Sequence, residues 1–352
     1  MPSLRQIILG LGLAVASINL VAAEPGLLVG YLDLSASPTP NIQAAVAHGY
    51  NVVVVGWGVV NPDDTAGIYP ATLSNEDDVP GGLAGDIAKA HDAQAKVFLT
   101  FGGEDNTFNP PAAASTQDAD VIATHIESLI QQYHFDGIDF DLESTRTSYD
   151  AAFIEALITR LKTDVPNLII TGAPQILAWE PGAIGFAPVA GAAVSWDNLA
   201  KSGLFNYLFV QDYNQGRGGV IFINGSVQET QDTDPGFLAA SHDDLLTSGD
   251  SQILPLPKST HIILGVPATP ASGNGMSDTS DINAELNCLN TATMAVCGQI
   301  HATTYQGPFL PHQSYSVPGL MTWSIGDDAN RNPNGAWSFV NAVKSCVINH
   351  SC

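Results

Sequence analysis

Positively charged side chains are scarce in this sequence. Lys and Arg together number 11 among 352 residues, against 35 Asp and Glu, which gives a formal net charge of -24 at pH 7. So acidic a chain is a poor candidate for binding nucleic acid or an anionic membrane. The charge is compatible with a neutral or a cationic partner, although it would equally serve to keep the protein in solution.

Long apolar runs are missing after the N-terminal segment. There, Arg5 precedes the apolar run Ile7–Leu20, and Val21-Ala22-Ala23 has the small residues of a signal-peptidase site. A membrane anchor is the alternative, but the run is short and ends at that cleavage-like site. We therefore predict a signal peptide at residues 1–23 and one domain at residues 24–352. The product would be secreted, extracellular or periplasmic, with no membrane partner.

Cysteine is rare and confined to the end of the chain, at Cys288, Cys297, Cys346 and Cys352. No Cys-x-x-Cys pair is present, the spacings do not suit zinc, and a nucleophilic cysteine is not indicated. Export to an oxidising compartment favours disulfides. Of the three possible connectivities, we favour the two local pairs, Cys288–Cys297 and Cys346–Cys352.

What the chain has instead is a row of acids in the segment Phe135–Glu143. Side chains alternate between the two faces of a strand, so Asp139, Asp141 and Glu143 share one face, with neighbours about 6–7 Å apart. Such a row repels itself unless one member holds a proton or a cation lies beside it. The spacing is not that of a calcium loop, and we predict no metal and no cofactor.

The strand carrying these acids belongs to a strand-then-helix rhythm along the chain. Amphipathic helices are expected between the strands, one of them capped by Ser115 or Thr116, the sixth at about Pro235–Leu246, and the last one beginning near Trp337. Eight such units form an α/β fold, the (β/α)8 TIM barrel, as one catalytic domain with its site at the carboxyl ends of the strands. The expected strands are Leu27–Tyr31, Asn51–Gly56, Lys96–Phe101, Gly137–Asp141, Leu168–Ala173, Tyr207–Val210, His261–Val266 and Gly319–Ser324.

The pattern Asp-x-x-Asp-x-Asp-x-Glu, at Asp136, Asp139, Asp141 and Glu143, resembles the signature of family 18 glycoside hydrolases, the chitinases and their relatives. Other segments are similar to elements of the smaller bacterial and plant type. They are Thr100-Phe101-Gly102-Gly103, Ala173-Pro174-Gln175, Gln211-Asp212-Tyr213-Asn214 and Gly319-Leu320-Met321-Thr322-Trp323-Ser324.

The resemblance implies a role for each acid. Glu143 would be the general acid, with a pKa raised by Asp141 and by burial. Asp141 would bind the N–H of the substrate's acetamido group, and Asp139 would share a proton with Asp141. Tyr213 would hold the acetamido carbonyl while its oxygen attacks the anomeric carbon, which gives retention through an oxazolinium ion.

The resemblance also implies substrate-binding residues. Trp323 would lie under the sugar, Gln211 would contact the same sugar, and the remaining candidates are Tyr31, Gly102, Gly103, Asp136, Gln175 and Asn214. After Trp323 the chain has Gly326-Asp327-Asp328, where relatives often place a bulky aromatic residue. Four further aromatic residues are equally suited to a sugar platform or to packing: Trp57, Phe108, Trp179 and Trp196.

We therefore expect a monomeric, endo-acting chitinase whose partner is chitin or chitooligosaccharide. An endo-β-N-acetylglucosaminidase that acts on N-glycans would use the same acids and is the first alternative. A chitin-binding lectin on the same barrel is the second. The retention of Glu143, Asp141 and Tyr213 argues against a lectin, since all three groups serve catalysis.

Overall fold

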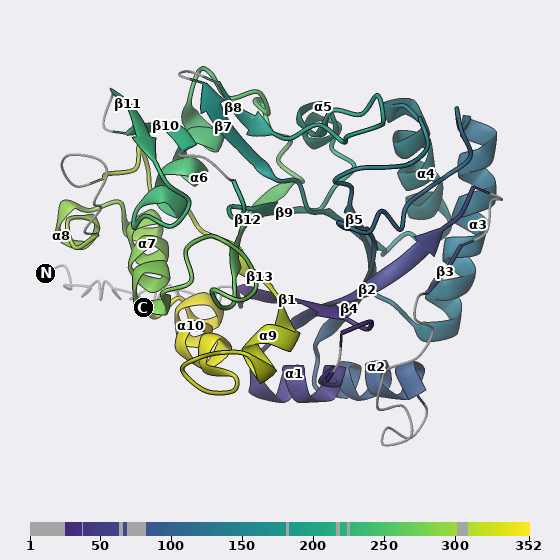
Figure 1. The fold of residues 1–352 in the computed structure, drawn as a ribbon, viewed down its shortest axis with the longest axis horizontal. Helices are drawn as coiled ribbons and strands as arrows, with labels where there is room; N and C mark the ends of the chain where they lie inside the picture. The colour runs from purple at the N-terminus through teal and green to yellow at the C-terminus, as the bar shows by residue number, and fades with distance from the viewer. Residues whose placement is uncertain are drawn as a thin grey trace, which may run out of the picture.

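Eight parallel strands close into a barrel in the computed structural model (Figure 1). The structure describes residues 25–36, 38–62, 66–68, 82–180, 183–215, 219–223, 226–300 and 309–352, so the predicted signal peptide lies outside it. Around the barrel the order is β1-β13-β12-β9-β6-β5-β4-β2, and the β1–β2 pairing closes it. All eight predicted strands are confirmed. They are β1 (Leu27–Asp33), β2 (Val52–Val60), β4 (Lys96–Gly102), β5 (Gly137–Asp141), β6 (Ile169–Gly172), β9 (Tyr207–Gln211), β12 (His261–Pro267) and β13 (Gly319–Trp323).

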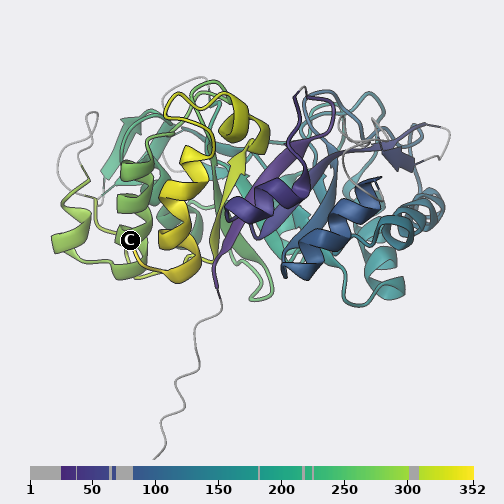
Figure 2. The same ribbon diagram turned by 90° about the horizontal axis from the view of Figure 1, so that it is seen from below.

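Helices form the outer layer, and Figure 2 shows α7, α10, α1 and α2 side by side along one flank. The predicted cap of α3 is confirmed, since Ser115 and Asp118 form a reciprocal capping box. The sixth helix lies within two residues of its predicted position. The helices are α1 (Ile42–His48), α2 (Gly82–Asp92), α3 (Thr116–Tyr133), α4 (Ala151–Asp164), α5 (Trp196–Lys201), α6 (Phe237–Thr247), α7 (Thr279–Thr291), α8 (Met294–Cys297), α9 (Ile325–Asn330) and α10 (Ser338–Asn349).

Strand β5 shows how the core is divided into two layers. Ile138 and Phe140 are buried in the large cluster between the strands and the helices. Asp139 and Asp141 alternate with them and are buried on the other face, inside the barrel. The interior also contains an apolar cluster, with Val54, Phe98, Phe209, Ile263 and Met321 among its members. The acid row therefore replaces hydrophobic side chains in the interior layer.

Several buried carboxylates bind the N-termini of helices that lie elsewhere in the chain. Asp86 accepts the backbone N–H of Ile42 in α1 at 2.6 Å, and Glu285 accepts that of Ala239 in α6 at 2.8 Å. Asp328 does the same for Phe339 in α10 at 2.9 Å. The first N–H groups of a helix have no intrahelical partner and favour a negative charge. Part of the acidic excess thus lies inside the fold, where it satisfies the N–H groups at helix N-termini.

Two antiparallel hairpins were not predicted from the sequence. The first consists of β7 (Ile176–Glu180) and β8 (Ala183–Phe186), and the second of β10 (Gly219–Ile223) and β11 (Ser226–Thr230). They follow the carboxyl ends of β6 and β9, and a short strand, β3 (Ala66–Ile68), pairs with the end of β2. All three therefore extend the end of the barrel at which the site is expected.

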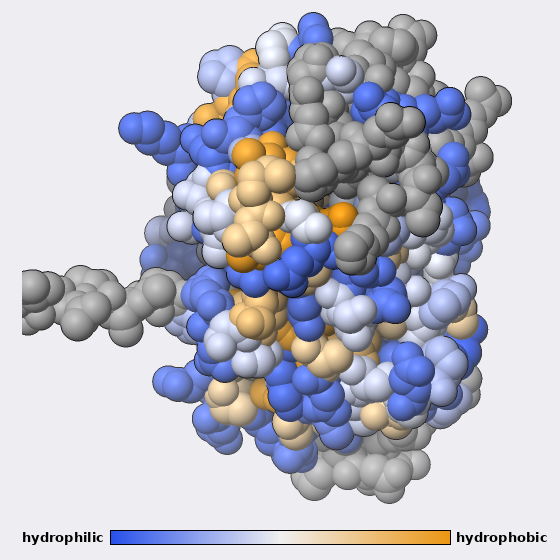
Figure 3. Space-filling view, turned by 90° about the vertical axis from the view of Figure 1, so that its left-hand side faces the viewer, coloured by the Kyte–Doolittle hydropathy of each residue, from blue (hydrophilic) through white to orange (hydrophobic). Residues whose placement is uncertain are grey.

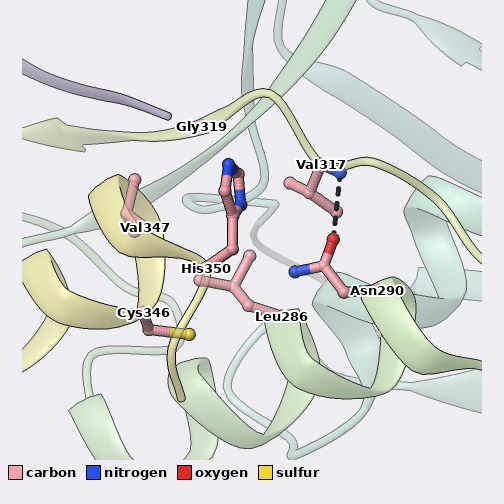
Figure 4. A pocket seen from close by; sticks show the side chains of 7 residues that line it. All are labelled: Leu286, Asn290, Val317, Gly319, Cys346, Val347 and His350. Carbon is pink, nitrogen blue, oxygen red and sulfur yellow. Dashed lines mark hydrogen bonds between the residues drawn. The ribbon is translucent and has the colours of Figure 1, made fainter. Parts of the chain in front are cut away.

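Both predicted disulfides are present. Cys288–Cys297 joins α7 to α8, and Cys346–Cys352 links α10 to the segment that follows it. Figure 4 shows the neighbourhood of Cys346, where α7, α10 and the start of β13 meet around a cavity of about 10 Å³. The backbone N–H of Val317 donates to Asn290 there at 3.1 Å. A cavity of this volume holds about one water molecule, so it offers no ligand site.

The surface is mostly hydrophilic on the face that Figure 3 shows, with a narrow apolar band beside the grey residues. Met294 of α8, on the same side of the molecule, is one of three large apolar side chains exposed among the described residues. Across the described helices, none has the length and apolar character needed to cross a membrane.

Candidate active site

A cavity of about 340 Å³ opens at the carboxyl ends of the barrel strands, a volume suited to a small ligand. It contains seven of the predicted site residues and three others. The predicted ones are Asp141, Glu143, Gln175, Gln211, Tyr213, Asn214 and Trp323, and the others are Trp57, Glu104 and Ser272. Trp57 was among the aromatic candidates. Glu104 directly follows the Gly102-Gly103 pair, and nothing in the sequence indicates Ser272.

A larger hollow of about 900 Å³ lies at the opposite end of the barrel. It is lined by residues at the strand starts, including Lys96, Tyr207 and His261, and the described lining contains no Asp or Glu. Glycosidic cleavage needs a carboxylic acid beside the leaving oxygen. The smaller cavity therefore contains the carboxyl groups that this reaction needs, whereas the described lining of the larger hollow contains none.

Gln211 joins the two acids of the cavity. Its Nε2 atom donates to Asp141 Oδ1 at 2.9 Å, to the carbonyl of Ala173 at 2.9 Å, and over a longer 3.4 Å to Glu143 Oε1. One amide nitrogen thus lies within reach of both carboxyl groups, which must be neighbours on one side of the cavity. A sugar cannot lie between them, as it would between the two carboxylates of an ordinary glycosidase.

Asp139 lies below this pair and is fully buried. It accepts hydrogen bonds from three hydroxyl groups, those of Tyr31 at 2.9 Å, Thr100 at 2.7 Å and Thr171 at 2.5 Å. Burial raises the pKa of Asp139 and these hydroxyls oppose the rise. The described hydrogen bonds of Asp139 lead to hydroxyls, and its proton sharing with Asp141 stays a prediction.

The pKa values of both cavity acids are raised. Burial is the largest cause for Asp141, whose pKa lies well above its usual range, followed by repulsion from Glu143 and Asp139. Burial also raises the pKa of Glu143, the hydrogen bond from Gln211 opposes it, and the charge of Glu104 adds to it. The sequence predicts repulsion by Asp141 as a cause of the raised pKa of Glu143, whereas in the structure burial is the largest cause and Glu104 is the neighbouring charge that adds to it. A coupled pair of this kind retains a proton at pH values at which isolated carboxylates would be ionised.

Tyr213 is 6% exposed and lines the cavity, and among the described contacts its hydroxyl has no hydrogen-bond partner. Burial raises the pKa of Tyr213 well above its usual value, so the phenol stays a donor. A loop after β12 holds its backbone, since Asn214 N–H donates to Asn274 O at 2.6 Å and Asn274 N–H donates to Asn214 Oδ1 at 2.8 Å. The structure thus presents a buried hydroxyl donor that has no acceptor among the described residues.

Asp212 points away from the cavity, into the layer between β9 and α6. It accepts a hydrogen bond from Ser241 at 3.0 Å, and its other oxygen is buried with no described partner. Burial raises the pKa of Asp212 to about 8, and the nearby Glu285 adds to the rise. The protonated form is therefore the one that the fold favours.

This burial predicts a pH-dependent stability. Because the folded pKa of Asp212 is raised, its stabilising contribution is complete below its unfolded value of about 4 and is lost as the pH rises through about 8. Asp212→Asn cannot ionise, so we expect it to raise the free energy of unfolding by roughly 1–3 kcal/mol near pH 8 and by much less near pH 5. Urea titrations at both pH values measure this. An equal effect at the two values would contradict it.

Two tryptophans border the acids. The rings of Trp57 and Trp323 are 6.1 Å apart, and Trp323 also lies 6.2 Å from Tyr31. Of the other aromatic candidates, Phe108 and Trp196 are buried core residues, and the side chain of Trp179 lies outside those described.

Three predictions of direct substrate binding are corrected at this end of the barrel. Tyr31 is 3% exposed and its hydroxyl donates to Asp139, so it supports the acid row. Gly102 and Gly103 are buried and have positive φ angles, and neither lines the cavity. A Cβ atom would collide with the Asp141 carbonyl at Gly102 and with the Trp57 ring at Gly103. The glycines permit the close approach of these protein groups.

Asp136 is a fourth correction, because it lies at the wrong end of the barrel. It precedes β5, where its carboxylate accepts hydrogen bonds from Lys96 Nζ at 2.7 Å and from the backbone N–H of Val97 at 2.9 Å. His91 Nε2 is 2.9 Å away. Asp136 therefore anchors the start of β5 against β4 and α2 and cannot reach a substrate at the other end.

The family model for glycosyl hydrolases family 18 matches residues 28–307. The chain belongs to this family. Endochitinase 4 of Metarhizium robertsii is 24% identical over 313 residues, which cover 84% of this chain and 78% of that protein. Exochitinase 1 of Streptomyces olivaceoviridis is 26% identical over 90% of this chain, and the match spans 55% of its own length.

Among solved structures, the C-terminal domain of ChiA from Legionella pneumophila superimposes with a TM-score of 0.68 at 22% identity. The match covers 93% of this chain and 100% of that domain. At this level of identity the likeness concerns the fold, which is the barrel described above. The family 18 glycoside hydrolase therefore has Asp141 and Glu143, the last two acids of the row, at the carboxyl end of β5, where they line the cavity.

Proposed function

We propose that this enzyme hydrolyses β-1,4-linked N-acetylglucosamine polymers by a retaining, substrate-assisted mechanism. The observation that carries the proposal is the placement of Asp141 and Glu143 around one amide nitrogen of Gln211. Two adjacent carboxyl groups cannot attack a sugar from one face while protonating it on the other. The nucleophile is then the substrate's own 2-acetamido oxygen. Tyr213 lines the cavity and its hydroxyl, without an acceptor among the described residues, would donate to that oxygen.

In the first step, Glu143 donates its proton to the glycosidic oxygen and the bond from that oxygen to the anomeric carbon breaks. The acetamido oxygen forms a new bond to the anomeric carbon, which gives an oxazolinium ion. Asp141 accepts the acetamido N–H and stabilises the positive charge, while Tyr213 holds the acetamido oxygen in line. Ionised Glu143 then takes a proton from water. The water oxygen bonds to the anomeric carbon from the face that the leaving group occupied. This opens the oxazolinium ring and retains the configuration.

The names of the relatives support chitin as the substrate class, and they include both an endochitinase and an exochitinase. The test is hydrolysis of fluorogenic chitobiose and chitotriose by residues 24–352. Cleavage supports the chitinase, and preference for the longer substrate supports endo action. Release of glycans from a high-mannose glycoprotein without chitin cleavage would favour the endo-β-N-acetylglucosaminidase, and chitin binding without hydrolysis would favour the lectin.

We further propose that the enzyme is exported.

The raised pKa of Glu143 predicts the shape of the pH profile. The general acid must be protonated, so kcat/KM falls as the pH rises through the pKa of Glu143. A raised pKa moves this alkaline limb of the profile to higher pH. We expect the limb clearly above the usual glutamate value of about 4.3. The measurement is kcat/KM on a chitotriose substrate across pH. A limb at the ordinary glutamate value would contradict the assigned proton.

A further inference from the structure

Glu104 is an acid of the cavity to which the mechanism assigns no role. It lies on the turn that leaves β4, and this turn is fixed to the catalytic strand. Gly103 N–H donates to the carbonyl of Asp141 at 2.8 Å, and Asn106 Nδ2 donates to the carbonyl of Glu104 at 3.1 Å. Asn106 in turn accepts a hydrogen bond from Ser144, the residue after Glu143. The Glu104 backbone is therefore held at a defined place beside the acids.

Among the described residues, the carboxylate of Glu104 has no hydrogen-bond or ion-pair partner. Its side chain is exposed. The cavity lining adds no counter-charge, since its described residues are Glu104, Asp141 and Glu143 among neutral side chains, without Lys, Arg or His. The charge reaches into the cavity, because Glu104 contributes to the raised pKa of Glu143. An unpaired anion in a cavity without cations attracts a cationic ligand group.

The barrel places Glu104 away from the group that receives the acetamido oxygen. Strand β4 is adjacent to β5. Strand β9, which leads to Tyr213, is the third strand from β4 around the barrel. The loop with Ser272 follows β12, which is four strands from β4 in either direction. Tyr213, which would hold the acetamido oxygen, therefore follows a strand well round the barrel from Glu104. A neighbouring unit of the polymer would then lie beside Glu104 and Trp57, whose ring lies against Gly103.

We propose that Glu104 is a specificity-determining residue that favours a positively charged glucosamine unit beside the N-acetylated unit being cleaved. The preferred substrate is then a partly N-deacetylated chitin. This inference rests on the proposed function and deepens it. The acetamido group is still required in the unit that reacts, because its oxygen is the nucleophile. The ammonium group of the neighbouring unit would lie at Glu104.

The experiment compares two substrates of the same chain length that differ in N-acetylation and therefore in charge. One is a preparation of partly N-deacetylated chitin oligosaccharides, and the other is the same preparation after chemical re-N-acetylation. The readout is the ratio of kcat/KM for the charged over the neutral substrate. Because Glu143 serves both substrates, a change in its pKa cancels in the ratio. The variants are Glu104→Gln and Glu104→Lys, with Asp105→Asn as the control for an exposed charge on the same turn outside the cavity lining.

We expect Glu104→Gln to lower the ratio about two- to fivefold, the size of an exposed ion pair, and Glu104→Lys to lower it further. About 1 M salt should remove most of the difference, since it screens charges beyond roughly 3 Å. An unchanged ratio in both variants, or an equal fall in Asp105→Asn, would overturn the proposal. So would loss of activity on both substrates in Glu104→Gln, because Glu104 would then be a nucleophile. A wild-type enzyme inactive on both substrates would instead contradict the proposed function.

Discussion

Glu143→Gln is expected to lower kcat on chitin oligosaccharides by about 10²–10⁴-fold, the usual contribution of a general acid. Glutamine has the same shape and can still receive the hydrogen bond from Gln211 Nε2 through its amide oxygen, but it has no proton to give to the leaving oxygen. KM should change little, because the mutation removes an interaction with the transition state and leaves the binding surface intact. Steady-state kinetics on a chitotriose substrate measures both parameters.

The matched control is Glu155→Gln, the same substitution at an exposed position of α4. It should retain wild-type rates. Thermal unfolding of both variants checks that the fold is intact, and we expect Glu143→Gln to be no less stable than the wild type, since it removes a partly buried titrating group. Residual activity within tenfold of the wild type would exclude Glu143 as the acid and would direct attention to Asp141 or Glu104.

The acid row shows how far a sequence motif specifies a site. Its alternation placed Asp139 and Asp141 inside the barrel, as the structure confirms. The same motif misled at Asp136. A strand rises about 3.3 Å per residue, so the seven steps from Asp136 to Glu143 span roughly 23 Å, the height of the barrel. The first and last acids of the motif therefore lie at opposite ends, and only the strand boundaries reveal which of them face a substrate.

Other features depend on contacts between segments far apart in the chain. Ser272 reaches the cavity because the barrel closes β12 next to β9, and local sequence does not encode that distance. The carboxylates of Asp328 and Glu285 would be read from the sequence as surface charges, yet each is buried at the N-terminus of a helix in another part of the chain. The eight strands were predictable because each is a short apolar run bounded by polar residues.

Asp141→Asn is the second substitution with a large expected effect, about 10²–10³-fold on kcat. The variant keeps the volume of the side chain but loses the negative charge that stabilises the oxazolinium ion. Repulsion from Glu143 is one cause of the raised pKa of Asp141, so the substitution also removes one of two coupled titrations from the pH profile of kcat/KM. Asp105→Asn, an exposed neighbour of the site, is the control and should change neither quantity.

Added azide separates the substrate-assisted mechanism from direct attack by Asp141. If Asp141 were a nucleophile, a small anion could occupy the space left in the truncated variant Asp141→Ala and restore turnover, with a glycosyl azide as product. In the substrate-assisted mechanism the nucleophile is still present on the sugar, and what is missing is the stabilising charge. Azide should therefore leave the rate of Asp141→Ala low. Recovery of activity together with glycosyl azide would overturn the mechanism while leaving Glu143 as the acid.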